Sequence, residues 1–126
     1  MSLTIRMKHA DDRADVVVVS LDGRLDTATA PDLERELDPV LEGSTREVIF
    51  DLEKLTFVSS AGLRIFGKVR KHLRARDGGT SFVHMQPQIA EVFEIVKALP
   101  GMSVFTSVAE LDRYLAARQR MHGQDQ

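Results

Sequence analysis

The 126-residue sequence contains no cysteine, and its charges nearly cancel to a net charge of −2. Without cysteine the chain has neither disulfide bonds nor thiolate chemistry. The balanced charge excludes an overall basic field that would attract nucleic acid. No apolar run approaches the roughly 18 residues of a membrane-spanning helix, and no charged segment followed by an apolar core marks a secretory signal. We therefore expect a cytoplasmic protein that does not bind nucleic acid and does not insert into the membrane.

Sequence motifs for several chemistries are missing as well. The phosphate-binding patterns G-x-x-x-x-G-K-[ST] and G-x-G-x-x-G do not occur, and no serine lies in the G-x-S-x-G motif of hydrolases. The histidines at positions 9, 72, 84 and 122 do not have the spacing of metal ligands. We therefore predict a protein that is not an enzyme and that has no metal site and no cofactor. A serine hydrolase built from distant His and Asp residues is the rival class.

Hydrophobic patterning predicts the strands of an α/β fold. Residues 3–8 alternate between apolar and polar side chains, as in a half-buried edge strand, and residues 16–21 form the apolar run of a buried strand. We expect these two segments to pair as a hairpin. Two further strands are predicted over residues 48–52 and 80–85, and residues 104–105 are a possible fifth strand.

Helical spacing of apolar residues appears between and after these strands. The segments that show it are 31–43, 60–76, 87–99 and 107–117. Pro39 should kink or restart the first helix, and Leu111 and Leu115 should face inward from the last one. This alternation predicts a mixed sheet of four or five strands with about four flanking helices, in a domain of residues 1–117. Residues 118–126 lack apolar periodicity and are expected to form a flexible tail.

Two adjacent serines, Ser59 and Ser60, mark the start of the second predicted helix. They lie in the segment FVSSAGLRIF, residues 57–66, which a short turn separates from the predicted strand over residues 48–52. A helix start carries unpaired N–H groups and the positive end of the helix dipole, so it accepts hydroxyl caps and anions. The plainest interpretation makes one serine an N-cap. The small residues Ala61 and Gly62 would leave the other hydroxyl exposed to a partner or to a modifying enzyme.

A second segment, GRLDTATAPDL at residues 23–33, leads from the second strand into the first helix. Its Asp26 and the preceding Asp22 could form an acid–base pair, but aspartate is common in turns. This segment, followed by IFDLEKLT and then FVSSAGLR, resembles the markers of the STAS domain family. The resemblance covers about residues 3–115, and within the family the chain is most similar to the stand-alone anti-sigma factor antagonists.

The resemblance implies a phosphorylation switch. Ser60, two residues before Gly62, would be phosphorylated by an anti-sigma factor that is also a serine kinase. The unphosphorylated form would bind this anti-sigma factor and free the sigma factor, and a PP2C-type phosphatase would reset the switch. Family members often carry Asp just before the acceptor, where this chain has Ser59, so Ser59 is a rival acceptor. The alternative is a STAS subunit that regulates a transporter, for example a lipid-transport ABC system, without phosphorylation.

The predicted partner surface joins the loop to the helix start. It comprises Gly23, Arg24, Leu25, Asp26, Thr27, Ser59, Ala61, Gly62, Leu63 and Arg64. A phosphoserine adds about −1.5 to −2 charge at pH 7, which a helix start tolerates and a packed partner must desolvate. We therefore expect Ser60→Asp to weaken binding and to fold normally. Asp26→Asn should also weaken binding, with nearly unchanged thermal stability. The sequence leaves the oligomeric state open.

Overall fold

The computed structural model describes residues 2–98 and 108–124. Its strands form one sheet in the order β1-β2-β3-β4. The hairpin predicted from the sequence is present, because β1 (Leu3–Ala10) pairs antiparallel with β2 (Arg13–Leu25). β3 (Glu47–Val58) then pairs parallel with β2, and β4 (Gly79–Val83) pairs parallel with β3. The sheet is therefore mixed, with the antiparallel strand at one edge.

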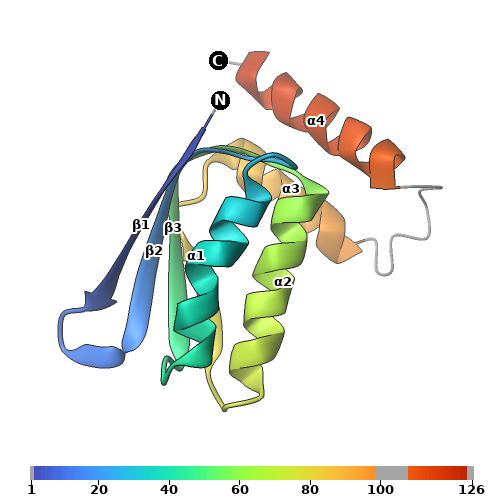
Figure 1. Cartoon of the computed structure of the whole chain (residues 1–126). Helices are drawn as coiled ribbons and strands as arrows, with labels where there is room; N and C mark the ends of the chain where they lie inside the picture. The colour runs from blue at the N-terminus through green and yellow to red at the C-terminus, as the bar shows by residue number, and fades with distance from the viewer. Residues whose placement is uncertain (1, 99–107, 125–126) are drawn as a thin grey trace.

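The helices supply the crossovers that parallel strands require. α1 (Ala30–Glu42) connects β2 to β3, and α2 (Ser60–Arg74) connects β3 to β4. α3 (Pro87–Ala98) follows β4, and α4 (Val108–Gln124) ends the described chain. In Figure 1, α1 and α2 lie side by side over one face of the sheet, and α4 lies beyond the end at which α2 begins. The predicted α/β fold is confirmed; its possible fifth strand at residues 104–105 falls outside the described residues.

The core lies between the sheet and the helices. Every second residue of β2 points into it, so Val17, Val19 and Leu21 are buried. Four phenylalanines from β3, α2, β4 and α3 form an aromatic cluster, in which the ring centroids of Phe50 and Phe66 are 4.8 Å apart. Burial of these rings fixes α2 against the sheet, and with it the position of the residues at the start of α2.

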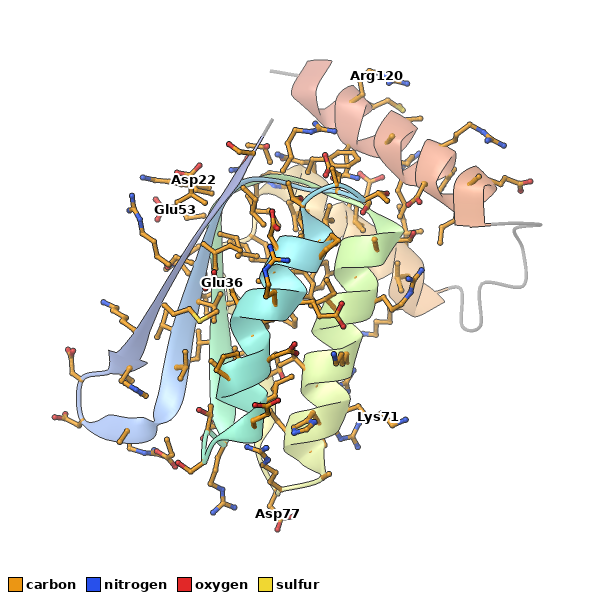
Figure 2. The ribbon with its side chains drawn as sticks, viewed as in Figure 1. Asp22, Glu36, Glu53, Lys71, Asp77 and Arg120 are labelled. Carbon is orange, nitrogen blue, oxygen red and sulfur yellow. The ribbon has the colours of Figure 1, made fainter. Side chains whose placement is uncertain are left out.

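The opposite face of the sheet carries a group of polar side chains. A shallow depression on this face is lined by side chains that include Arg6, Ser20 and Lys54. Figure 2 shows Asp22 and Glu53 on this side of the sheet, away from α1 and α2. Such one-sided burial is common when an antiparallel pair forms part of the sheet.

Several elements differ from their predictions. Pro39 does not restart α1: the helix continues through it to Glu42, with Pro39 on the exposed side. β3 runs to Val58 rather than residue 52, so no turn separates it from the serines. The prediction of a flexible tail is wrong for residues 118–124, which continue α4. The buried Gln119 explains this difference, because its side chain hydrogen-bonds to the backbone of β3.

Candidate functional site

The ends of β2 and β3 bring together the two segments that the sequence singled out. Leu25 pairs with Val58 at the end of the parallel ladder. One residue further on, the Ser59 N–H donates a hydrogen bond to the Leu25 carbonyl over 2.9 Å. The loop after β2 and the start of α2 therefore lie side by side at the carboxyl ends of these strands, the edge where open α/β sheets often place their sites.

Gly23, near the end of β2, lies where a residue with a larger side chain would not fit. Gly23 has a φ of +120°, a conformation that side chains with a Cβ rarely adopt. A Cβ at this position would also lie 2.5 Å from the carbonyl oxygen of Ser2. Gly23 thus allows β2 to pass close to the start of β1 before the chain turns toward α1.

Asp26 holds the turn between β2 and α1. Its Oδ1 accepts hydrogen bonds from the N–H groups of Ala28 and Thr29, each at 3.0 Å. Its own N–H donates to the Thr29 hydroxyl oxygen at 2.9 Å. Burial tends to raise the pKa of Asp26, but these hydrogen bonds and the nearby Arg24 outweigh burial and lower the pKa below its ordinary value. Asp26 is therefore a charged structural residue of the turn.

The start of α2 packs directly on this turn through Gly62. A Cβ at Gly62 would lie 2.6 Å from Leu25 Cγ and 3.1 Å from Val58 Cγ2. The first turn of α2 can approach the sheet this closely only because no side chain intervenes. Leu25 and Gly62 were predicted to contact a partner, but both are buried in the core, so a partner cannot touch them in this conformation.

The exposed hydroxyl expected at Ser60 is not found. Ser60 is only 5% exposed, because α4 covers it. The Ser60 N–H donates to Oδ1 of Asp112 at 2.8 Å, and the Ser60 hydroxyl donates to Oδ2 of the same carboxylate at 3.0 Å. Asp112 thus caps α2 from another helix: it satisfies an N–H group that the helix leaves unpaired and places a negative charge at the positive end of the helix dipole.

Ser59 occupies the N-cap position of α2 without capping it. Its backbone has the extended conformation of an N-cap residue, with φ −102° and ψ 174°, but its side chain makes no capping hydrogen bond. The Ser59 hydroxyl oxygen is buried and has no hydrogen-bond partner among the described residues. The predicted cap is therefore in the right place, but Asp112 performs the capping.

A groove between α1 and α2 begins beside this site. It has a volume of about 370 Å³, and its lining includes Thr27, Pro31, Glu34, Ala61, Arg64 and Lys68. Three of the predicted partner residues, Thr27, Ala61 and Arg64, thus face one shared space. At the far end of the groove, Lys68 donates a hydrogen bond of 2.7 Å to Glu34, which raises the pKa of the Lys68 ammonium.

The remaining predicted partner residues differ in exposure. Arg24 is exposed, and its guanidinium lies 4.0 Å from the centre of the Phe57 ring in a cation–π contact. Leu63 is half-buried against the core, and Ser59 is buried. Asp112 and Gln119 were not predicted as site residues. Gln119 continues the spacing of Leu111 and Leu115, which are buried as expected, and this spacing could have indicated its burial.

One group of potential metal ligands lies on the open face of the sheet. Ligand atoms of Asp51, Glu53 and His84 all lie within 4.8 Å of one another. His84 Nδ1 is 3.1 Å from Asp51 Oδ1, so a hydrogen bond accounts for their proximity. Glu53 and His84 are exposed, as residues of a solvated strand end commonly are.

The fold and the site define a small α/β domain. Its characteristic feature is a buried serine at the start of a helix, which an aspartate of another helix covers. The sequence profile of the STAS domain matches residues 7–111, and the chain belongs to this family. Among its relatives is BtrV of Bordetella bronchiseptica, to which the role of anti-sigma factor antagonist is assigned. The two are 38% identical over 90 residues, which cover 71% of this chain and 78% of BtrV.

Solved structures share the fold. An anti-sigma factor antagonist from Mycobacterium paratuberculosis superposes with a TM-score of 0.64 at 26% identity, over 93% of this chain and 94% of that chain. The Bacillus cell fate determinant SpoIIAA in its phosphorylated form superposes with a TM-score of 0.62 at 22% identity, over 73% of this chain and 82% of that chain. The chain is therefore SpoIIAA-like in fold. None of the helices described here is long and apolar enough to cross a membrane.

Proposed function

We propose that this chain is an anti-sigma factor antagonist that acts by binding rather than by catalysis. Its partner is an anti-sigma factor with serine kinase activity, which it binds through the loop after β2 and the first turns of α2. The position of Ser60, at the start of α2 and beside the groove that Thr27, Ala61 and Arg64 share, is the observation that carries this proposal. The relatives, which include BtrV, are named as anti-sigma factor antagonists, and this supports an anti-sigma factor as the partner.

Phosphorylation of Ser60 is the proposed off-switch. The γ-phosphoryl group of ATP moves to the Ser60 oxygen, which gives up its proton, and ADP leaves. The phosphate carries about −1.5 to −2 charge at pH 7. A partner packed over Ala61 and Arg64 would have to desolvate this charge, so the complex dissociates. A PP2C-type phosphatase removes the phosphate and restores binding. Ser59 is the rival acceptor.

Calorimetric titration with the kinase-type anti-sigma factor encoded nearest to this gene tests the proposal. Ser60→Ala should bind the partner at least as tightly as the unmodified chain. Ser60→Asp should bind at least tenfold more weakly, a difference of about 1.4 kcal/mol. Ser44→Asp is the matched control, because Ser44 is exposed beyond the opposite end of α1 and should tolerate the same charge without loss of affinity.

Equal affinity of the Ser60→Ala and Ser60→Asp variants would contradict the switch at Ser60. Mass spectrometry of the chain after incubation with the kinase and ATP then assigns the acceptor. Phosphate on Ser60 supports the proposal, and phosphate on Ser59 alone transfers the switch to the rival serine. Absence of any binding by the unmodified chain would overturn the proposed class of partner.

A further inference from the structure

We propose that α4 is a latch over the phosphorylation site: Asp112 holds Ser60 closed to the kinase, and a phosphate on Ser60 displaces α4 from the start of α2. The latch consists of Asp112 and Gln119, which bond to the start of α2 and to the end of β3, together with the buried Leu111 and Leu115. This inference rests on the proposed function, because it takes Ser60 as the acceptor and adds how access to it is controlled.

The closed state leaves the kinase no access to the Ser60 hydroxyl. Ser60 is 5% exposed, and its hydroxyl proton is directed to Asp112 Oδ2 at 3.0 Å. A kinase must bring the γ-phosphorus of ATP into line with this oxygen and remove the same proton. Asp112 therefore has to leave before the reaction, and α4, which carries it, has to move with it.

The phosphorylated state is incompatible with the closed one. Asp112 already occupies the place at the start of α2 where backbone N–H groups and the helix dipole favour an anion. A phosphate on Ser60 would compete for this place and bring a second negative group against the Asp112 carboxylate. Like charges at hydrogen-bond distance in a buried site repel strongly. The phosphate thus drives α4 away from Ser60.

The open state has its own cap. Ser59 already has the backbone conformation of an N-cap residue, while its buried hydroxyl oxygen has no hydrogen-bond partner in the described structure. When Asp112 leaves, the Ser59 hydroxyl can turn to accept from the first N–H groups of α2. The start of α2 therefore has two capping arrangements, one with Asp112 and one with Ser59, and α4 selects between them.

The anchors of α4 set how firmly the latch closes. The Gln119 amide donates to the Val58 carbonyl and accepts from the Val58 N–H, both at 2.9 Å. Arg118 also forms an ion pair with Glu91 of α3. These contacts lie on the later turns of α4 and Asp112 lies on its earlier part, so the closed position of α4 is held at both ends.

Hydrogen–deuterium exchange of the full chain, read by mass spectrometry, tests the latch without a kinase or a partner. Ser60→Asp, which places a carboxylate against Asp112, should speed amide exchange over residues 109–121 by at least about tenfold. Asp112→Ala should do the same by removing the bond. The double variant Ser60→Asp with Asp112→Asn removes the repulsion, and its exchange should return toward that of the unmodified chain. Ser44→Asp is the charge control and should leave α4 unchanged.

Unchanged α4 exchange in both Ser60→Asp and Asp112→Ala would overturn the latch. If the amides of β2 also lose their protection from exchange in Ser60→Asp, that variant has unfolded. The exchange of Asp112→Ala alone then tests the proposal. The kinase provides a second measurement, because Asp112→Ala should be phosphorylated several-fold faster at Ser60. A chain that shows the exchange pattern but is never phosphorylated would retain the closed contact of α4 and overturn the proposed phosphorylation switch, so the two failures are distinguishable.

Discussion

At the scale of single residues, two carboxylates hold the backbone at the functional end of the sheet. Asp112 caps α2 from a distant helix, whereas Asp26 closes the local turn that precedes α1. The bonds of Asp26 stay within its own loop. Its replacement should therefore change the shape of the turn that a partner would contact, and its effects on stability and on binding should be coupled.

Asp26→Ala should lower the free energy of unfolding by about 1–2 kcal/mol, because the Ala28 N–H loses its acceptor and the Thr29 N–H keeps only its longer bond to the Asp26 carbonyl. Asp26→Asn keeps an acceptor oxygen and should lower the free energy of unfolding by less than Asp26→Ala does. The decrease should still exceed the negligible one expected for a substitution in an ordinary surface turn. Urea denaturation of both variants measures the difference, and the exposed Asp22→Asn should behave as the unmodified chain. Equal stability of Asp26→Ala and the unmodified chain would show that the turn does not depend on this carboxylate.

The lowered pKa of Asp26 also predicts a pH dependence. In the unfolded chain an aspartate titrates near its ordinary pKa of about 3.9, and in the folded chain the pKa of Asp26 is lower. The stabilisation from its charge is therefore present above pH ~4 and is lost as the pH falls through the folded pKa. The gap in melting temperature between the unmodified chain and Asp26→Asn should accordingly be present at pH 7 and shrink below pH ~4. A gap that grows with acid would contradict this assignment.

At the scale of elements, α2 contains two glycines in different environments. A Cβ at Gly62 would meet Leu25 and Val58, whereas a Cβ at Gly67 would meet nothing within 4 Å. Gly67→Ala should stabilise the chain by up to about 1 kcal/mol, since alanine favours helix. Gly62→Ala gains the same preference but overpacks a buried contact at a cost of about 1–3 kcal/mol, so its net effect should be destabilising by about 1 kcal/mol.

Thermal or urea denaturation of the two glycine variants, measured side by side, shows whether each substitution raises or lowers the free energy of unfolding. A stabilising Gly62→Ala would mean that α2 can shift away from the sheet without loss of packing. Such a shift would also move Ser60, so the phosphorylation rate of Gly62→Ala is worth measuring beside its stability.

The elements themselves were predictable because their side-chain periodicities are local. The apolar alternation of β2 and the helical spacing in α2 follow from contacts with one continuous core. The end of β3 was not predictable in this way, since its polar residues do not alternate cleanly. Past Asp51 it lacks β4 as a neighbour, and the glutamines Gln86, Gln88 and Gln119 bond instead to its backbone at Glu53, Thr56 and Val58.

The serine site shows the limit of prediction from sequence most clearly. Its parts were identified correctly: the glycine-containing loop, the paired serines and the helix start do lie together. The burial of Ser60 was not predicted, because it depends on Asp112, which lies 52 residues further along the chain. Nothing in the local pattern distinguishes this aspartate from other polar residues of an amphipathic helix. Contacts between side chains distant in sequence are set by packing, which periodicity does not encode.

At the scale of the whole molecule, α4 is attached differently from the other helices. α1 and α2 are crossovers whose two ends are fixed by strands, and their buried faces lie against the sheet (Figure 1). α4 instead packs mainly on α3 and is bonded to β3 and α2 through Gln119 and Asp112. Figure 2 shows Arg120 on its outer side, away from these contacts. We therefore expect α4 to open as a unit at a lower free energy than the sheet.

Native-state hydrogen exchange in low urea tests this expectation. Amides of α4 should open with a lower free energy and a smaller urea dependence than those of β2, because less surface is exposed.

Gln119→Leu leaves both backbone groups of Val58 unpaired and destabilises only the closed state. It should therefore lower the opening free energies of α4 and β2 equally, by about 2 kcal/mol. Val19→Ala removes core packing that is lost only on global unfolding, so it should lower the value for β2 by about 2 kcal/mol and leave α4 unchanged. An equal acceleration of α4 exchange by Val19→Ala would show that α4 opens only when the whole chain unfolds.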